Sequence, residues 1–335
     1  MRTAFFFRLF VALSLIDIAG LAQDFHLSQY DANPLYLNPA LTGMNLNENW
    51  DYRFNANYRE QWTKFLGGPT ATVAAGFDKP LNAKFSFGQY VLDNRDATGA
   101  LNTFNFMLSG SYKIIANDPE HHHHLSVGVQ MGLLQKNFNP ANFVYDSQYA
   151  PSSATVFDHS LPSGENFSRE STFNFDANMG IFYRLVDSSK TSSPFAGFSV
   201  YHLTQPDESL TGAISKTPMR FNFNAGCYFK LNKEFTLLPQ LLYMNQAQAN
   251  EFNLEVLGFY KLHNSGYEPI IGVAWRNKDA FAIHIGLKQK RTTVRISYDI
   301  NTSYLQPYSK GRGGLEFSII YTGKRKSRED SAPSF

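Results

Sequence analysis

The sequence predicts an all-β protein, a transmembrane antiparallel up-and-down β-barrel of the outer-membrane type with about 14 strands. Three observations lead to this prediction. Only 17% of the residues are charged, although the hydrophobic content is 43%. Apolar and polar residues alternate with a period of two, in segments of about ten residues, the length that a tilted strand needs to cross a bilayer. Long and short connections fall mainly at opposite ends of these segments.

The composition excludes several classes of protein. Soluble domains usually carry about 25% charged residues, so a solvated acidic or basic protein is excluded. No stretch of roughly 18 apolar residues follows the first twenty positions, which excludes a helical membrane protein. The 30 Lys and Arg and 28 Asp and Glu form no concentrated basic face, and we expect no nucleic-acid partner. The single cysteine, Cys227, excludes an intramolecular disulfide and a cysteine-based zinc site.

Residues 1–22 have the features of a secretory signal peptide. Arg2 and Arg8 accompany an apolar run that ends in small residues at Ala22, and the run is too short to span a membrane. No cysteine follows the cleavage point, so we expect no lipid anchor there. We therefore predict an exported chain that becomes an integral protein of the cell outer membrane, in contact with its lipid.

Fourteen candidate strands follow from Trp50 onward. They lie near residues 50–59, 70–78, 85–93, 101–113, 125–136, 172–184, 195–203, 219–231, 235–245, 251–262, 269–276, 280–288, 291–300 and 314–322. In the first, aromatic residues and Ala56 share one face, beginning with Trp50, Tyr52 and Phe54. An even number is typical of single-chain bacterial barrels, whose closure leaves no free edge in lipid. A secreted sandwich, with the same apolar face turned to a core, is the alternative.

Connection lengths favour the barrel. If the chain enters from the periplasm, the loops that face outward include 60–69, 137–171, 204–218 and 301–313. The sorting is imperfect, because 114–124 and 185–194 are long for periplasmic turns. With 14 strands, both ends of the barrel domain lie on the periplasmic side. The predicted organisation is a signal peptide at 1–22, a periplasmic N-terminal segment at 23–49, the barrel at 50–322 and a basic and polar C-terminal tail at 323–335.

No arrangement of residues in the sequence is typical of an enzyme. There is no nucleophile elbow, zinc-protease helix motif, phosphate-binding loop or dinucleotide-binding motif. His159 lies between Asp158 and Ser160, but sequence neighbours on one loop do not form a catalytic triad. We interpret the glycines at 311–314 as a flexible entry to the last strand. We expect no catalytic residue and no cofactor.

The run His121–His124 is the one histidine cluster. Successive residues of an extended segment point to opposite faces, so a closed metal site would need ligands from elsewhere. A solvated hairpin turn is the default interpretation, which predicts no metal site, and metal binding stays an open alternative.

Charges on the polar faces of the candidate strands have mixed signs. In a barrel they face the lumen, where they either line an aqueous path or cross-link the wall. A selective channel usually shows an excess of one sign, so we favour structural ion pairs. The first and last strands become neighbours on closure, and we predict that Arg53 meets Glu316 across this seam.

The segment before the first strand contains two Asn-Pro pairs, which flank Leu35, Tyr36 and Leu37. The prolines at 34 and 39 are predicted to block both helix and strand, and each preceding Asn is restricted to an extended or turn conformation. An apolar knot of this kind is poorly suited to solvent. We expect it to pack either in the periplasmic mouth of the barrel or on a partner protein.

Two blocks of the sequence resemble the PorP/SprF family of type IX secretion. The first comprises Ser28-Gln29-Tyr30, Asn33-Pro34-Leu35-Tyr36-Leu37-Asn38-Pro39-Ala40, Tyr58-Arg59-Glu60-Gln61-Trp62 and Pro69-Thr70. The second comprises Ser297-Tyr298-Asp299-Ile300, Leu305-Gln306-Pro307-Tyr308 and Gly311-Arg312-Gly313-Gly314-Leu315-Glu316. The loop at 137–171, the histidine run and the tail after Tyr321 match no motif of the family.

The resemblance implies an outer-membrane barrel of Bacteroidota that serves type IX secretion and gliding motility. One branch of the family is linked to the periplasmic ring and to peptidoglycan-binding proteins, and another exports or anchors a large adhesin through its C-terminal sorting domain. The sequence does not separate the branches. The family is not enzymatic. For partner binding we predict Asn33, Pro34, Tyr36, Asn38 and Pro39 on the periplasmic side, and Arg59, Gln61 and Trp62 at the first outer loop.

A channel for a hydrophobic or other small solute is the main alternative function. Such a channel should have a substantial N-terminal plug and an apolar pocket in its lumen, and residues 23–49 are short and polar for a plug. A surface lipase or protease is a third hypothesis, for which no nucleophile arrangement is present.

Overall fold

The computed structural model describes residues 24–44, 50–61, 69–96, 98–115, 122–150, 157–187 and 190–324. The predicted signal peptide, Trp62, His121 and nearly all of the predicted tail lie outside these ranges. Among the residues that the structure describes, no helix has the length and apolar character to cross a membrane.

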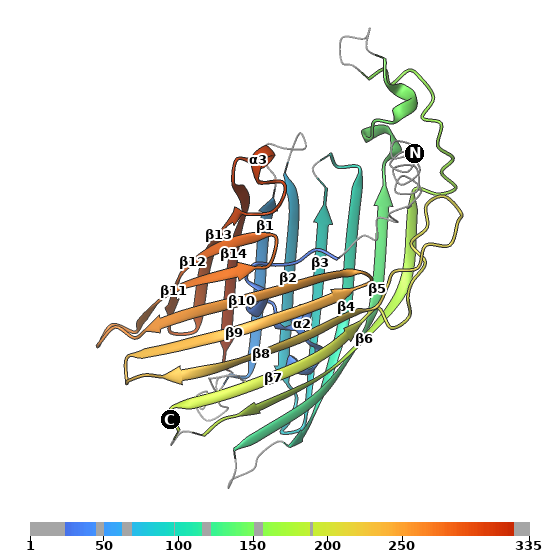
Figure 1. Cartoon of the computed structure of the whole chain (residues 1–335). Helices are drawn as coiled ribbons and strands as arrows, with labels where there is room; N and C mark the ends of the chain where they lie inside the picture. Colours follow the sequence, from blue (N-terminus) through green and yellow to red (C-terminus); the bar gives the residue numbers. More distant parts are fainter. Residues whose placement is uncertain are drawn as a thin grey trace, which may run out of the picture.

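Fourteen antiparallel strands close into one barrel, in which consecutive strands pair and β1 pairs with β14 (Figure 1). The strands are β1 (Tyr52–Gln61), β2 (Thr70–Pro80), β3 (Phe85–Arg95), β4 (Leu101–Ile115), β5 (His123–Phe138), β6 (Ser171–Leu185), β7 (Ser192–Tyr201), β8 (Arg220–Lys230), β9 (Phe235–Gln246), β10 (Ala249–Tyr260), β11 (Tyr267–Arg276), β12 (Ala280–Gln289), β13 (Thr292–Asn301) and β14 (Arg312–Gly323). This closed barrel confirms the predicted fold class. Closure leaves no strand edge without a hydrogen-bonding partner strand.

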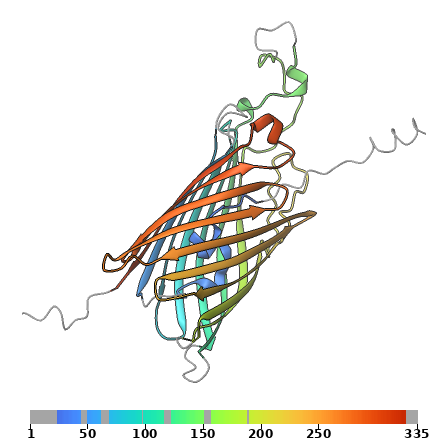
Figure 2. The same cartoon turned by 60° about the vertical axis from the view of Figure 1, so that its left-hand side comes forward.

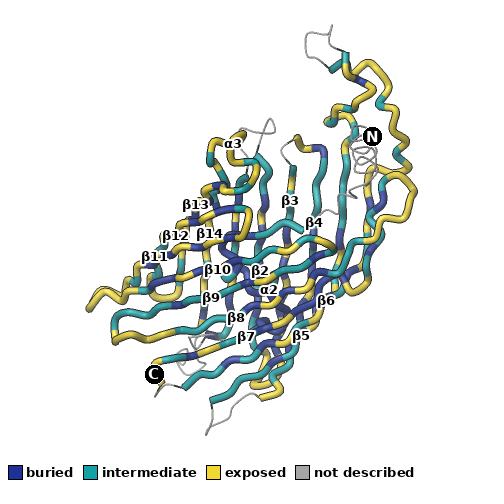
Figure 3. Tube along the Cα trace, viewed as in Figure 1, coloured by how far each residue is buried: buried dark blue, intermediate teal, exposed yellow. Residues whose placement is uncertain are grey.

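The period-two pattern separates two faces of the wall. In β1, Phe54 and Tyr58 are exposed on the outside, while Arg53 and Arg59 are buried in the lumen. Buried residues gather in the middle of the barrel (Figure 3). Trp50, predicted on the lipid face, precedes β1 and is buried, with the Arg53 guanidinium 5.0 Å from its ring centre.

The two ends of the barrel differ in their connections (Figure 2). One end carries the start of β1, the end of β14 and short turns such as 231–234 and 290–291. The other end carries the long connections 139–170, 202–219 and 302–311, the last of which contains α3 (Gln306–Ser309). Outer-membrane barrels place short turns in the periplasm and long loops outside, so these are called the inner end and the outer end.

The first and last strands pair as predicted, but the predicted residue pairing between them is wrong. Arg59, not Arg53, lies opposite Glu316, and Arg53 lies opposite Thr322. Arg53 instead pairs with Asp78 of β2, at 2.8 Å. The stagger of a closed barrel follows from the tilt of all its strands together, so neighbouring strands alone do not fix it.

The N-terminal segment forms three short helices inside the barrel: η1 (Tyr30–Ala32), α2 (Pro34–Leu37) and η2 (Pro39–Leu41). Pro34 and Pro39 were predicted to block helix, yet each occupies the start of one. Proline is tolerated there because the first N–H groups of a helix have no partner within it.

Candidate functional site

Residues 24–44, called the plug, run through the lumen from the outer end to the inner end (Figure 1). At the outer end, Asp24 contacts Arg220 and His202, which adjoin the long loop 202–219. Toward the inner end, the Gly43 N–H donates to the Asp78 carboxylate at 2.6 Å. The described part of the predicted periplasmic segment therefore lies inside the barrel, where Asp24 and the Gly43 N–H both contact charged groups of the wall.

Apolar contacts hold the middle of the plug. Leu35 is fully buried against Ala74, Tyr90, Leu92 and Met107 of strands β2 to β4. A second cluster joins plug residues with the wall: Tyr30, Leu37, Ala40, Leu41 and Met44 with Phe182 and Leu242. Of the two placements predicted for the apolar knot, the structure shows packing within the barrel.

Two glycines of the wall make room for the second Asn-Pro pair. Gly128 of β5 lies opposite Gly180 of β6. A Cβ atom at Gly128 would lie 2.3 Å from the Pro39 carbonyl carbon, and one at Gly180 would lie 2.1 Å from the Asn38 Oδ1. The Asn38 side chain then donates to the Ile181 carbonyl at 3.0 Å and caps η2 by accepting from the Ala40 N–H at 2.9 Å.

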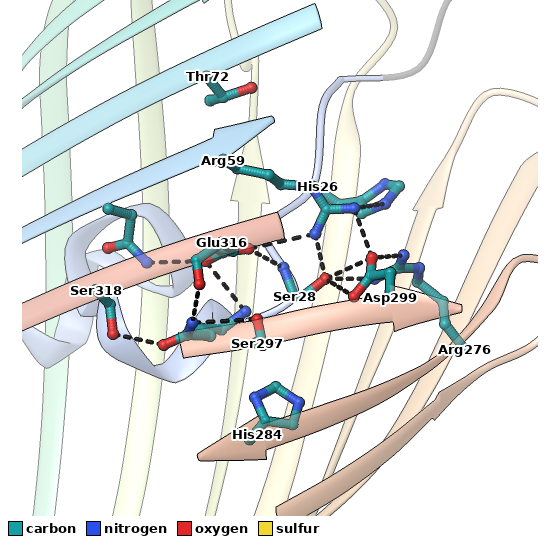
Figure 4. Close-up of polar contacts among 12 residues, drawn as sticks. His26, Ser28, Arg59, Thr72, Arg276, His284, Ser297, Asp299, Glu316 and Ser318 are labelled. Carbon is teal, nitrogen blue, oxygen red and sulfur yellow. Dashed lines mark hydrogen bonds and ion pairs between the residues drawn. The ribbon is translucent and has the colours of Figure 1, made fainter. Parts of the chain in front are cut away.

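Four buried charges from the wall, Arg59, Arg276, Asp299 and Glu316, form what we call the luminal network (Figure 4). Arg59 lies 2.8 Å from Asp299 and 3.2 Å from Glu316. Arg276 contacts Asp299 at 2.8 Å. Two guanidinium groups thus meet two carboxylates, and the pairing compensates the cost of removing them from water.

The plug completes this network. The Ser28 hydroxyl donates to Asp299 at 2.7 Å, and the Ser28 N–H donates to Glu316 at 2.7 Å. The Gln29 amide donates to the Glu316 carbonyl and to the Ser297 hydroxyl. The network therefore fastens the plug to strands β1, β11, β13 and β14 through hydrogen bonds to charged groups, which are stronger than those between neutral groups.

A second cluster of charges holds the plug at the outer end. Asp24 lies 2.8 Å from both Arg220 and His202, and His202 lies 2.7 Å from Asp176. Burial alone would lower the pKa of His202, but the two carboxylates raise it to about 10. Burial would raise the pKa of Asp24, but His202 and Arg220 hold it well below its usual range. The Arg220 guanidinium also lies over the Tyr36 ring, at 4.7 Å.

The inner end contains a cavity of about 630 Å³, whose lining includes Asp31 and Pro34 of the plug. We call it the basic cavity, because its walls carry Arg53, Arg184, Lys230, Lys261, Lys288, Arg291 and Arg295. Among the described residues, the carboxylates that line it are those of Asp31 and Glu268. The sequence shows no run of these cations, because strands that are distant in sequence bring them together.

The outer end presents apolar side chains on its loops. Ile214 is 81% exposed and Tyr304 is 85% exposed. Loop 202–219 is joined to the wall by an ion pair of 2.5 Å between Glu208 and Lys136. These side chains lie beyond the strands, on connections where outer-membrane barrels face the medium.

The predicted partner-binding residues are mostly inaccessible. Asn33, Pro34, Asn38 and Pro39 are buried in the lumen, and Tyr36 is half-buried, its hydroxyl donating to the Phe25 carbonyl at 2.7 Å. Arg59 belongs to the luminal network, and Gln61 lies beside its guanidinium. Trp62 lies outside the described residues.

Sequence reasoning missed the outer charge cluster and the basic cavity. His202 and Arg220 adjoin a long loop, and no local signal marks them. Within the described ranges, no group of three or more His, Cys, Asp or Glu is placed to hold a metal ion. His121 lies outside those ranges, and His123 Nδ1 lies 2.6 Å from the Tyr183 hydroxyl. The default interpretation of the histidine run, a hairpin turn without a metal site, stays a prediction.

Comparison with known proteins identifies the family. The model of the type IX secretion system membrane protein PorP/SprF matches residues 19–321. The chain belongs to the PorP/SprF family. Its fold and family point to an integral barrel of the outer membrane that serves type IX secretion. A comparison with curated proteins gave no match.

Solved structures show a similar barrel. The toluene transporter TbuX of Ralstonia pickettii is 9% identical and has a TM-score of 0.50, with 87% of this chain and 93% of that chain covered. A FadL homologue of Pseudomonas aeruginosa is 13% identical, with a TM-score of 0.44 and coverage of 85% and 92%. At these identities the likeness to TbuX shows the fold alone.

Proposed function

We propose that this PorP/SprF protein is a plugged docking barrel, which holds other proteins at its two ends and has no enzymatic activity. The observation that carries the proposal is the plug. Residues 24–44 are packed in the lumen and fastened by buried charges at two levels. A barrel whose lumen is filled by a plug that is bonded to the wall is suited to act as a rigid anchor in the membrane.

The two ends suit different partners. The exposed Ile214 and Tyr304 at the outer end offer apolar contact to an exported protein, such as an adhesin or its C-terminal sorting domain. The inner end faces the periplasm, where the ring and peptidoglycan-binding components of type IX secretion are the expected partners. Export of this chain by its own signal peptide belongs to the same proposal.

A solute channel is the second candidate, and one of its two expected features is present. The N-terminal segment does plug the lumen, so its shortness is no argument against a channel. The other feature, an apolar pocket in the lumen, is less well supported. The apolar hollow beside Tyr30, Leu37, Leu242 and Met244 holds about 10 Å³, whereas ligand pockets are about 300–1,000 Å³.

Locking the plug separates the two candidates. The Thr42 hydroxyl of the plug lies 2.6 Å from the Ser109 hydroxyl of β4, so Thr42→Cys with Ser109→Cys places two sulfurs within bonding reach. Cys227→Ser removes the native thiol. A strain that lacks the gene is complemented with this locked variant, and secreted and surface-bound proteins are quantified.

If the protein is a docking barrel, export and adhesin retention should continue after the disulfide between positions 42 and 109 has formed, because no part of the lumen has to open. The single-cysteine variants are the matched controls. Loss of export only in the oxidised double variant, or unchanged export in the strain without the gene, would contradict the proposal. Lost uptake of a small solute in the locked strain would favour the channel.

A further inference from the structure

Among the residues that the structure describes, the basic cavity is lined by more cationic side chains than carboxylates. Arg53 is paired with Asp78 at 2.8 Å, and Arg295 with Asp31 at 2.6 Å. Lys288 lies opposite Glu268 between β11 and β12. Lys230, Lys261 and Arg291 are exposed around the same cavity, and no carboxylate of the described residues forms an ion pair with them. The chain as a whole carries a formal charge of only +2.

The positions of these three cations indicate the shape of the ligand. Lys230 ends β8, Lys261 follows β10, and Arg291 lies in the turn between β12 and β13. They therefore come from three separate places on the mouth of the barrel. A small anion contacts one such place, whereas an extended chain with several carboxylates contacts all three.

The remaining lining indicates the chemistry between those carboxylates. Trp50, Leu238, Phe259 and Ile270 contribute apolar surface to the same cavity. Such surface favours a peptide whose acidic residues alternate with apolar ones over a uniformly charged polymer. The volume of about 630 Å³ lies within the range of ligand pockets, about 300–1,000 Å³.

The location of the cavity indicates where the ligand comes from. These cations line the inside of the barrel wall, away from the lipid that surrounds it, and the cavity lies at the inner end beneath the plug. Lipid headgroups contact the outside of the wall. A segment that enters from the periplasm reaches the cavity directly.

We infer that the basic cavity binds an extended acidic peptide segment of a periplasmic protein, with carboxylates on Lys230, Lys261 and Arg291 and apolar side chains against the lining. The inference deepens the proposed docking function and rests on it, since it names the chemistry of the inner partner.

A binding experiment on the purified full chain in detergent tests the inference. The probe is a fluorescent ten-residue peptide of alternating Glu and Leu, and its affinity is measured by polarisation at low and high salt. The variant Lys230→Glu, Lys261→Glu, Arg291→Glu should lose at least about tenfold in affinity, because like charges replace complementary ones. Binding to the unaltered chain should weaken as salt screens the charges.

The matched control reverses three cations at the same end that do not line the cavity: Lys84→Glu, Lys233→Glu and Lys290→Glu. Its affinity should stay within about twofold of the unaltered chain, because the charges lie outside the site. A milder variant with Gln at 230, 261 and 291 covers the case in which the charge reversal impairs folding. Equal losses in the cavity and control variants, or binding that salt does not weaken, would overturn the inference.

Complementation in cells separates this inference from the proposed function. One outcome is that deletion of the gene impairs export and the cavity variant restores it fully. Binding of an acidic peptide in the basic cavity is then refuted, while the proposed docking function is retained. The other outcome is that deletion leaves export unchanged while the purified chain still binds the peptide through the cavity. The proposed docking function is then refuted, while the peptide-binding site is retained.

Discussion

The luminal network and the basic cavity use the same kinds of side chain to opposite effect. In the network, Arg59 is 1% exposed and contacts both Asp299 and Glu316. In the cavity, Arg291 is exposed and no carboxylate of the described residues pairs with it. Buried cations that share carboxylates with the plug hold the fold together. Solvated cations around an open cavity are available to a ligand.

One strand connects the two regions. Asp299 lies near the outer end of β13, in the network, and Arg291 immediately precedes the inner end of the same strand. Between Arg291 and Asp299, the role of a charge changes from ligand-facing to structural. Counter-charge and access to water therefore distinguish the roles, and residue type does not. The following four predictions test this comparison, from the largest expected effect to the smallest.

Arg59→Ala should lower the free energy of unfolding by about 3–5 kcal/mol, because it leaves two buried carboxylates with less positive charge. Arg291→Ala, the control from the cavity, should change it by less than about 0.5 kcal/mol. Urea unfolding in detergent, followed by tryptophan fluorescence, measures both. Equal effects of the two substitutions would break the distinction between the regions.

Phe223→Arg should destabilise the barrel by up to about 2–4 kcal/mol, the cost of an arginine among lipid tails, with less effect nearer either end of the wall. Phe223 is 42% exposed on the predicted lipid face of β8. The control Thr236→Arg adds the same charge to the lining of the basic cavity, away from the lipid tails. Heat-modifiable mobility of the folded barrel reports assembly, and normal amounts of both variants would refute the assignment of faces.

Gly180→Ala should weaken the packing of the plug against the wall and lower the free energy of unfolding by about 1–3 kcal/mol, because the new Cβ would overlap the Asn38 side chain. Gly110→Ala is the matched control, since a Cβ at Gly110 meets no atom within 4 Å. Limited proteolysis of the purified chain should release plug fragments faster from the first variant only. Equal rates would show that the close approach at Gly180 is not required.

Raising the pH should weaken the outer charge cluster. The pKa of His202 is raised from 6.5 to about 10, so its stabilising contribution is complete below about pH 6.5 and is lost as the pH rises through about 10. The loss is at most about 1.4 kcal/mol per pH unit, the limit for one proton. His202→Asn should flatten this dependence in urea titrations between pH 6 and 10. The same slope in both proteins would assign it to another group.

Much of the fold was predictable because each strand carries its own local signal. Phe54 and Phe223 lie on the exposed face as the period-two pattern indicated, and all 14 strands begin and end within three residues of the predicted bounds. The prediction that Pro34 and Pro39 prevent helix formation was wrong. The rule against proline applies to helix interiors, and both residues occupy first positions.

The candidate site was less predictable because its residues are distant in sequence. The structure buries the predicted residues Asn33, Asn38 and Arg59 in the lumen, and their predicted role in partner binding stays a prediction. The pairing of Arg59 with Glu316 depends on the stagger of the closed barrel, which shifted the predicted partner from Arg53. His202 gains its importance only from Asp24 and Asp176, which reach it from other parts of the chain.

The sequence by itself determined the barrel, its number of strands, its lipid face and its family, because alternation and family motifs are written in consecutive residues. Only the tertiary structure decided that residues 24–44 fill the lumen, and that Lys230, Lys261 and Arg291 line one cavity. The physical reason is closure. Until 14 strands meet as one cylinder with a common tilt, neither the inside of the lumen nor the neighbours of any charge within it are defined.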